Sequence, residues 1–150
     1  MLGSLAKWLR IFGNDTFYPT AETTDDDLLR IATEEQRVLI TRDKELIVRA
    51  KKHHLPVLMI ATTNLDEQIT QVLHHIGFTM EKLLTRCIVC NTPLRTVEKR
   101  MVKSFVPPKV FETRDEFWFC PVCSKYYWKG THYENMSEKI KGFQKTNSRP

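Results

Sequence analysis

The chain has 150 residues, of which 41% are hydrophobic and 27% are charged, a composition that is typical of a globular protein and excludes wholesale disorder. No apolar run approaches the roughly 20 residues that span a bilayer, and the N-terminus lacks a signal-peptide pattern, so we expect an intracellular, cytoplasmic protein without a membrane partner. The net charge of +5 and the isoelectric point near 9.1 favour a polyanionic partner, because lysine and arginine side chains replace counterions along phosphates.

The N-terminal part of the chain begins with an amphipathic pattern. Apolar residues at helical spacing predict a helix over residues 2–12, with Gly13 placed to end it. We expect a short strand at residues 16–18. A second helix is predicted over residues 24–35, where Asp27 completes a variant of the capping box.

Two apolar runs predict buried strands at residues 38–41 and 56–60. Helical patterns follow them at residues 45–53 and 65–76. This alternation of helices and strands predicts right-handed crossovers and a parallel sheet, with three strands when the short strand is counted.

The pattern changes after a predicted domain boundary near residues 80–86. The stretch bracketed by the cysteine pairs at 87–90 and 120–123 has apolar residues over 102–111, interrupted by Pro107 and Pro108. This stretch predicts short antiparallel strands and turns. The basic tail, residues 136–150, is expected to fray.

Four cysteines form two closely spaced pairs, Cys87 with Cys90 and Cys120 with Cys123. Two residues between thiolates allow a tight turn to aim both sulfurs at one ion, and two such turns complete a tetrahedral zinc site. A site with four protein ligands is closed, so we predict a structural zinc on which the folding of residues 86–130 depends. A redox dithiol and an iron–sulfur cluster are the alternatives.

Thr41, Arg42 and Asp43 come directly after the first long strand pattern. Ligands bind at the carboxyl ends of strands in open α/β sheets, so these residues are candidates for a site. The local pattern favours Asp43 as the cap of the helix that follows it, and one residue can serve both roles.

Asp25, Asp26 and Asp27 lie in the first turn of a predicted helix. Negative charge there suits the helix dipole, so capping and solvation explain them without a ligand. The alternative is that Asp26 and Asp43 lie close together and share a Mg²⁺ or Mn²⁺ ion, which would orient water for attack on a phosphate.

Aromatic and basic residues are interleaved near the second cysteine pair. Aromatic faces stack on unpaired bases while cations follow the phosphates, although aromatics in a small zinc module also cover the metal site. The residues that we predict to contact nucleic acid are Arg10, Lys125, Trp128, Lys129 and His132.

Taken together, these features resemble the Mut-seven C-terminal RNase domain family, a branch of the PIN-like nucleases with an attached zinc ribbon. The resemblance covers residues 1 to about 136. The matching segments are residues 1–13, 26–32, 39–43, 86–91, 120–123 and 127–132.

The resemblance implies an α/β fold with a PIN-like parallel sheet flanked by helices, followed by a small zinc ribbon. The expected domains are residues 1–85 for the PIN-like part and 86–135 for the ribbon, with the tail at 136–150. PIN-like domains usually begin with a strand that ends in a metal-binding aspartate, and this sequence has no such strand ahead of Met1. We expect either that the chain lacks its natural N-terminus or that the site is short of one acid.

The implied activity is metal-dependent hydrolysis of RNA, with single-stranded RNA as the expected partner. By position, Asp26 and Asp43 match the family's metal-binding acids, and Thr41 is a hydrogen-bonding partner of the second. Arg42 would face the phosphate or brace the site. Asp25 could take the place of Asp26, because neighbouring residues in a helical turn differ by about 100° in direction.

Two rival functions follow from the same residues. The first is a non-catalytic RNA-binding or ribosome-associated module, which would bind RNA with a steep salt dependence without cutting it. The second makes the ribbon a docking platform for protein partners.

Overall fold

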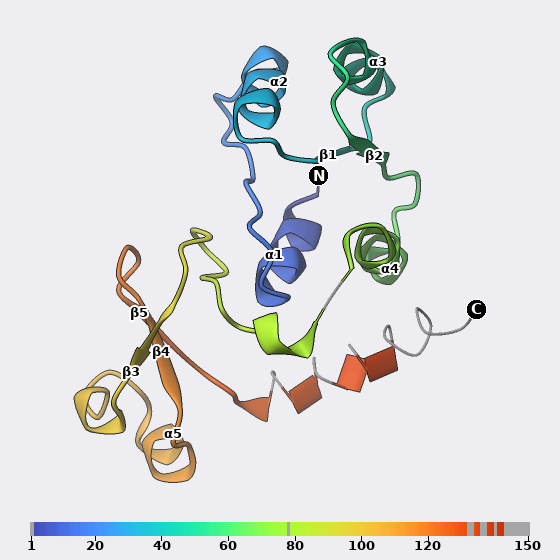
Figure 1. Ribbon diagram of the computed structural model, residues 1–150. Helices are drawn as coiled ribbons and strands as arrows, with labels where there is room; N and C mark the ends of the chain where they lie inside the picture. The colour runs from blue at the N-terminus through green and yellow to red at the C-terminus, as the bar shows by residue number, and fades with distance from the viewer. Residues whose placement is uncertain (1, 78, 132–133, 136–137, 140, 143–150) are drawn as a thin grey trace. The chain divides into compact units, whose positions relative to one another are not determined.

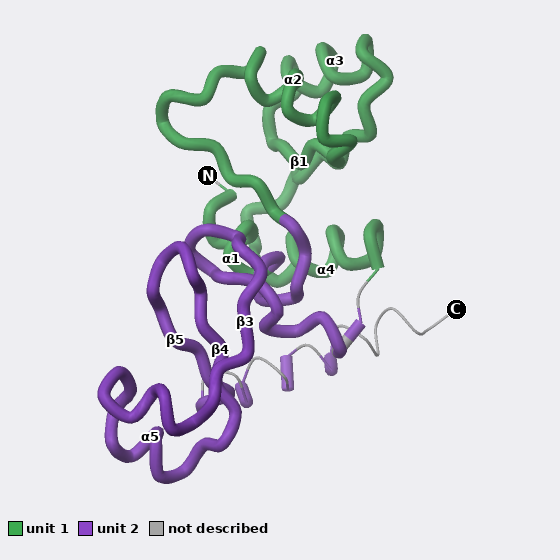
Figure 2. Tube along the Cα trace, turned by 60° about the vertical axis from the view of Figure 1, so that its left-hand side comes forward, with its two compact units in different colours: residues 1–8, 16–77 green, residues 9–15, 78–150 purple. Residues whose placement is uncertain are grey.

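The computed structural model describes residues 2–77, 79–131, 134–135, 138–139 and 141–142. The chain forms two compact units (Figure 2). Unit 1 holds residues 1–8 and 16–77, and unit 2 holds residues 9–15 and 78–150. The sequence patterns did not indicate that residues 9–15 belong with the cysteine-containing part of the chain.

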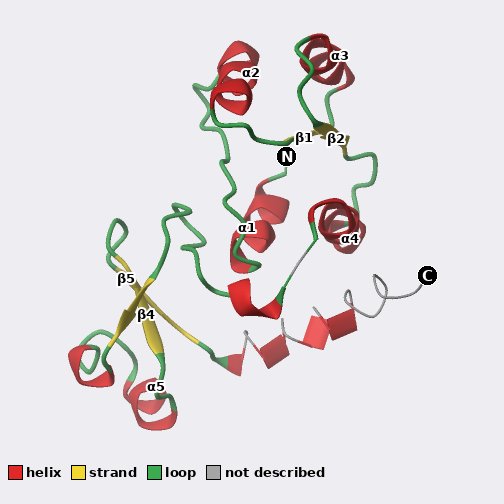
Figure 3. Cartoon of the chain, viewed as in Figure 1, coloured by secondary structure: helices red, strands yellow, loops and turns green. Residues whose placement is uncertain are grey.

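Unit 1 is a mixed α/β structure with a two-stranded parallel sheet (Figures 1 and 3). Strands β1 (Leu39–Thr41) and β2 (Val57–Met59) pair with Leu39 opposite Val57 and Thr41 opposite Met59. The helices of unit 1 are α2 (Asp25–Glu34), α3 (Lys44–Lys52), α4 (Leu65–Ile76) and the first residues of α1 (Gly3–Ile11). Helix α3 connects the two strands, so the predicted α/β class with a parallel sheet is confirmed.

The helices of unit 1 begin at side-chain caps that the sequence specifies. The hydroxyl of Thr24 accepts a hydrogen bond from the backbone N–H of Asp27, and the Asp27 carboxylate accepts one from the backbone N–H of Thr24. This capping box starts α2 as predicted. Asn64 caps α4 in the same way, by accepting a hydrogen bond from the N–H of Glu67 at 3.0 Å.

A small leucine-rich core joins α2 and α3 to the strand pair. Figure 1 shows both helices on the same side of the two strands. The cluster comprises Leu29, Leu39, Leu46 and Ala50, with Leu28, Leu55 and Val57 packed against it. Strand β2 is less buried than predicted, because a two-stranded sheet leaves each strand with one open edge.

The expected strand at residues 16–18 does not form, so that part of the prediction is wrong. These residues are irregular, and the side chains of Phe17 and Tyr18 are exposed. Aromatic residues next to Pro19 raised the strand propensity, but strand structure needs a ladder partner, and none pairs with this segment in the described part of the chain.

Unit 2 contains a three-stranded antiparallel sheet. Strands β3 (Arg95–Val97) and β5 (Lys125–Trp128) flank β4 (Phe117–Cys120). Short helical segments η1 (Met80–Lys82) and η2 (Lys99–Met101) precede helix α5 (Pro108–Thr113). Val102, Val106 and Phe117 form the buried cluster of this unit.

The antiparallel strands predicted between the two cysteine pairs are present as β3 and β4, but residues 108–113 form helix α5 instead of a strand or turn. We interpreted Pro107 and Pro108 as interruptions of a strand, but Pro108 occupies the first helical position, where its missing N–H costs no hydrogen bond. Val110 and Phe111 on this helix then pack against the buried cluster.

Residues 9–15 are tied into unit 2 through the backbone. Gly13 has φ +85°, the conformation expected after a helix end, and a Cβ added there would overlap the backbone carbonyl of Lys82. The N–H of Leu84 donates to the carbonyl of Ile11 at 2.9 Å.

The helices within the described residues are all too short or too polar to cross a membrane.

Candidate functional site

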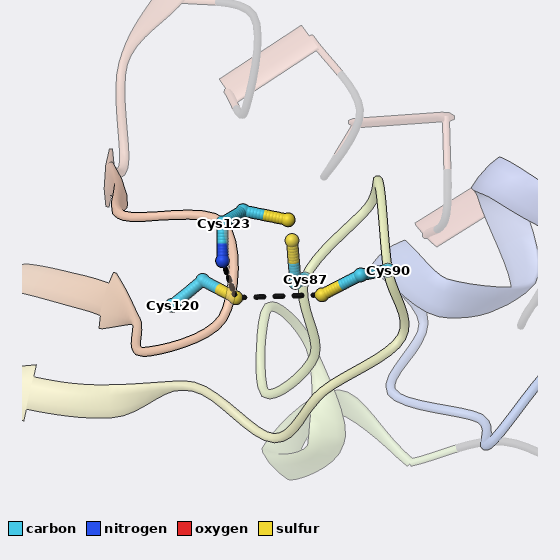
Figure 4. Close-up of side chains that lie close together, drawn as sticks. All are labelled: Cys87, Cys90, Cys120 and Cys123. Carbon is cyan, nitrogen blue, oxygen red and sulfur yellow. Dashed lines mark hydrogen bonds between the residues drawn. The ribbon is translucent and has the colours of Figure 1, made fainter.

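The four cysteines meet in unit 2 (Figure 4). Cys87 and Cys90 come from one turn, residues 87–90, which we call the first knuckle, and Cys120 and Cys123 come from the second knuckle, residues 120–123. All four sulfur atoms lie within 4.8 Å of one another, and none is in a disulfide. The two cysteine pairs therefore come together, and their four sulfur atoms could hold one metal ion.

The cysteine cluster fits a zinc ion. Zinc–sulfur bonds of about 2.3 Å in a tetrahedron place sulfur atoms about 3.8 Å apart, and the sulfurs of Cys90 and Cys120 are 3.4 Å apart. Hydrogen-bond donors surround the sulfurs: the Tyr127 hydroxyl lies 3.0 Å from Cys87, and the N–H of Cys123 donates to Cys120 at 3.3 Å. Such donors stabilise metal-bound thiolates and fix their orientation.

The thiols differ in acidity. Burial opposes ionisation of Cys90, but hydrogen bonding with the side chain and backbone of Thr92 lowers its pKa to about 6. Hydrogen bonding to Cys90, together with burial, raises the pKa of Cys123 to about 12. Zinc binding requires all four cysteines as thiolates. Binding of zinc would therefore release protons from the cysteines that are still protonated at neutral pH.

Arg10 supports the first knuckle from within the same unit. Its guanidinium Nη1 donates to the carbonyl oxygens of Ile88 and Val89, both at 3.0 Å, and the residue is only 9% exposed. We predicted that Arg10 contacts nucleic acid, and its burial argues against that role. The sequence pattern gave no sign that a turn distant in the chain covers Arg10.

Asp15 adds a second connection between residues 9–15 and the first knuckle. Its carboxylate accepts a hydrogen bond from the Asn91 amide at 2.6 Å and lies 3.9 Å from the Arg86 guanidinium. Both partners lie directly beside the knuckle in sequence. The knuckle that carries Cys87 and Cys90 is therefore held by side chains as well as by its own turn.

The second candidate site lies in unit 1, where β1 ends. Asp43 follows this strand and caps α3, since its carboxylate accepts hydrogen bonds from the N–H groups of Glu45 at 2.9 Å and Leu46 at 3.3 Å. The N–H of Asp43 donates to the Thr41 hydroxyl at 3.1 Å, so the predicted contact between these two residues is present. Asp43 and Arg42 occupy the expected turn, and Asp43 is exposed to solvent.

Asp25 and Asp26 lie in the first turn of α2 and face Arg49 of α3. Arg49 forms an ion pair with Asp26, and a second guanidinium nitrogen lies 3.8 Å from Asp25. The Asp26 side chain is nevertheless 84% exposed. An arginine thus supplies the positive charge between these carboxylates, while Asp27 is committed to the capping box.

The structure does not gather these acids into one cluster. Across residues 2–77, 79–131 and the described tail positions, the four cysteines are the only group of three or more potential metal ligands within 4.8 Å of one another. Asp26 and Asp43 both belong to unit 1, but each has its own partner, Arg49 for one and the N-terminus of α3 for the other.

Polar residues that we did not single out follow β2. The strands are parallel and the N–H of Ile60 donates to the carbonyl of Thr41, so the ends of β1 and β2 lie at the same edge of the sheet. Further along the chain, Asn64 caps α4 and Asp66 lies in the first turn of that helix. The sequence could have indicated these residues, because a polar run follows an apolar strand pattern after β2 as it does after β1.

The predicted nucleic-acid contacts near the second knuckle differ in availability. Lys125 is exposed, whereas Trp128 packs against the buried cluster of unit 2. The Lys129 ammonium lies 5.6 Å from the centre of the Trp118 ring and 3.8 Å from the Glu116 carboxylate. His132 and much of the tail over residues 136–150 lie outside the described residues.

Comparison with known proteins gave one match. A family model described as the Mut7-C RNAse domain matches residues 1–140, which is nearly the whole chain. The comparison with curated proteins and the comparison with solved structures gave no match.

Proposed function

Since the chain belongs to the Mut7-C RNAse domain family, we propose that it is a Mg²⁺- or Mn²⁺-dependent ribonuclease that hydrolyses phosphodiester bonds of RNA. The observation that carries this proposal is the family match over residues 1–140. We also propose that unit 1 is PIN-like, because its acids lie at a helix start and at the end of a parallel strand.

Asp26 and Asp43 are the residues that we propose to hold the divalent ion, with Asp25 as the alternative to Asp26. Carboxylate oxygens are the donors that Mg²⁺ and Mn²⁺ prefer, and the exposure of these side chains leaves them accessible to an ion and to RNA. When bound, the ion would activate water and stabilise the charge that develops on the phosphate.

Other residues of unit 1 orient this site. The Thr41 hydroxyl accepts a hydrogen bond from the N–H of Asp43 and so fixes the turn that presents the Asp43 carboxylate. Arg42, in the same turn, would contact a phosphate oxygen of the substrate. Arg49 holds Asp25 and Asp26 in place until an ion or the substrate reaches them.

We propose that the cysteines hold a structural zinc and that unit 2 binds single-stranded RNA. Four thiolates close the coordination sphere, so this zinc would carry no catalytic water. Lys125 is exposed at the start of β5 and places positive charge where phosphates would be attracted.

The test compares cleavage of labelled single-stranded RNA by wild type and by Asp43→Asn, with Mn²⁺ present. Asparagine caps helices as well as aspartate does, so this substitution removes the charged ligand while the start of α3 is retained. We expect the cleavage rate to fall about 100-fold or more, which corresponds to about 3 kcal/mol of transition-state stabilisation.

Glu34→Gln is the matched control, because Glu34 is an exposed acid on α2 that pairs with an arginine, Arg30, at 3.2 Å. We expect this variant to cleave RNA at the wild-type rate. Equal rates for wild type and Asp43→Asn would refute the assigned role of Asp43.

A non-catalytic RNA-binding module is the second candidate function. The observation that favours it is that Asp25 and Asp26 form ion pairs with Arg49. Within the described residues, they do not belong to a cluster of three potential metal ligands. This candidate predicts that wild-type protein retains RNA with a steep salt dependence and leaves it intact at every Mn²⁺ concentration.

A further inference from the structure

One face of the unit 2 sheet carries a row formed by a cation and two aromatic rings. Arg95 on β3 is the register partner of Phe119 on β4, and Phe119 is the partner of Tyr126 on β5. Register partners in an antiparallel sheet project from the same face. The row therefore runs across all three strands.

Phe105 adds a further ring to this row. Its ring stacks on Tyr126 with centroids 5.1 Å apart and planes 18° from parallel, and Tyr126 lies 4.9 Å from Phe119. Phe105 is 64% exposed, so it adds a large apolar ring to the surface instead of completing the core. We call Arg95, Phe119, Tyr126 and Phe105 the aromatic strip.

Cations without acidic partners accompany the strip. Within the part of the chain that the structure describes, Arg95, Lys103 and Lys125 are exposed and form no ion pair, whereas Lys99 and Arg100 are paired with Asp115 and Glu98. Lys103 is two residues from Phe105, and Lys125 directly precedes Tyr126. The charge that remains around the rings is thus positive.

Stacked rings beside unpaired cations have the chemistry that binds single-stranded nucleic acid. Bases stack on aromatic faces and phosphates attract the cations, while a duplex offers no unstacked base to such a surface. A protein partner would have to present apolar and acidic groups to the same strip, and single-stranded RNA supplies both contacts at every nucleotide.

We propose that the aromatic strip of unit 2 binds single-stranded RNA by stacking bases on Phe105 and Phe119 while Arg95 contacts the backbone phosphate. This inference rests on the proposed function, because it names where that function's substrate is held. Tyr126 packs against the buried cluster as Trp128 does, so its role in the strip is to support the ring of Phe105. The proposal moves the predicted contact surface from Trp128 to Phe105 and Phe119, and away from Lys129, which faces Glu116.

The experiment measures binding of fluorescein-labelled oligouridine to the zinc-loaded full chain by anisotropy, in Mg²⁺-free buffer at several salt concentrations. Phe105→Ala should weaken binding about tenfold and leave the salt dependence unchanged, since it removes a stacking surface without a charge. Arg95→Gln should weaken binding and reduce the slope of log K against log salt by about 0.7.

Met101→Ala is the matched control, because Met101 is 60% exposed and apolar in the same unit but lies outside the strip. This variant should bind like wild type, and a duplex competitor should displace oligouridine poorly. The proposal is overturned if wild type does not bind, if Phe105→Ala binds like wild type, or if Arg95→Gln keeps the wild-type salt slope.

Cleavage with Mn²⁺, measured on the same samples, separates this inference from the proposed function. If wild type cuts RNA and Phe105→Ala binds RNA like wild type, the proposal for the aromatic strip is refuted and the ribonuclease proposal is retained. If RNA binds to the aromatic strip but is never cut, the ribonuclease proposal is refuted and the proposal for the strip is retained.

Discussion

The guanidinium of Arg10 donates hydrogen bonds to two carbonyl oxygens of the first knuckle. Arg10 therefore stabilises the turn that carries Cys87 and Cys90. Arg10→Met keeps much of the side-chain volume but leaves the carbonyls of Ile88 and Val89 without this donor. Both hydrogen bonds are part-buried, and a hydrogen bond that involves a charged group contributes about 1.5–3 kcal/mol. We expect Arg10→Met to lose zinc to a chelator faster than wild type does.

The control is Lys7→Met, which changes an exposed cation on the same helix. Zinc release is followed with a metal-sensitive dye, a readout that does not depend on nuclease activity. Equal release rates for Arg10→Met and Lys7→Met would contradict the role given to Arg10.

Gly13 combines positive φ with close approach to the backbone of Lys82. Gly13→Ala should therefore destabilise unit 2 through both conformational strain and overlap. Gly77 also has positive φ, but an added Cβ there meets nothing within 4 Å, so Gly77→Ala incurs only the conformational cost of about 1–3 kcal/mol. Urea denaturation should show the larger loss for Gly13→Ala, and the reverse order would contradict this interpretation.

At the level of elements, helix α2 depends on its capping box. The backbone N–H of Thr24, then its hydroxyl and the nearby Arg30, hold the pKa of Asp27 below its usual 3.8. Because the folded-state pKa is the lower one, the stabilising contribution is fully present above pH 3.8 and is lost as the pH falls through the depressed value.

We expect wild type to be more stable than Asp27→Asn at pH 7 and at pH 5, with the difference shrinking once the pH drops below 3.8. Urea denaturation of both proteins at each pH measures this difference in the free energy of unfolding. Loss of zinc in acid affects both proteins, so its effect cancels in the difference. A difference that widens on acidification would contradict the assignment.

Most of the elements could be predicted because their signals are local. Caps at Thr24, Asp43 and Asn64 and the glycines after α1 and α4 define helix ends from neighbouring residues alone. The failures needed distant partners: residues 16–18 lacked a strand to pair with, and helix α5 formed where Val110 and Phe111 reach a core.

The candidate sites follow the same rule. The cysteine site was predictable because the spacing within each pair already defines a knuckle. The ion pair of Arg49 with Asp26 joins two helices, and the burial of Arg10 joins residues far apart in sequence, so neither could be predicted from periodicity.

At the scale of the whole molecule, the two units should respond differently to metal removal. Unit 2 has a small buried cluster and needs the cysteine centre to hold its knuckles, whereas unit 1 has its own core and contains no cysteine. A strong zinc chelator should therefore unfold unit 2 and leave the helices of unit 1 formed.

Tryptophan fluorescence should report this change, because Trp118 and Trp128 belong to unit 2, while far-UV circular dichroism should retain the helical signal of unit 1. Cys87→Ser should resemble the chelated protein. Unchanged tryptophan emission after complete zinc removal would show that unit 2 folds without metal.

The central claim is that Asp26 and Asp43 share one divalent ion in unit 1. Titration of the zinc-loaded chain with Mn²⁺, followed by electron paramagnetic resonance of the free ion, tests it most directly. We predict that wild type binds Mn²⁺ at a site that both Asp26→Asn and Asp43→Asn weaken at least tenfold, with Glu34→Gln unchanged. Mn²⁺ binding that is the same in all four proteins would contradict the claim.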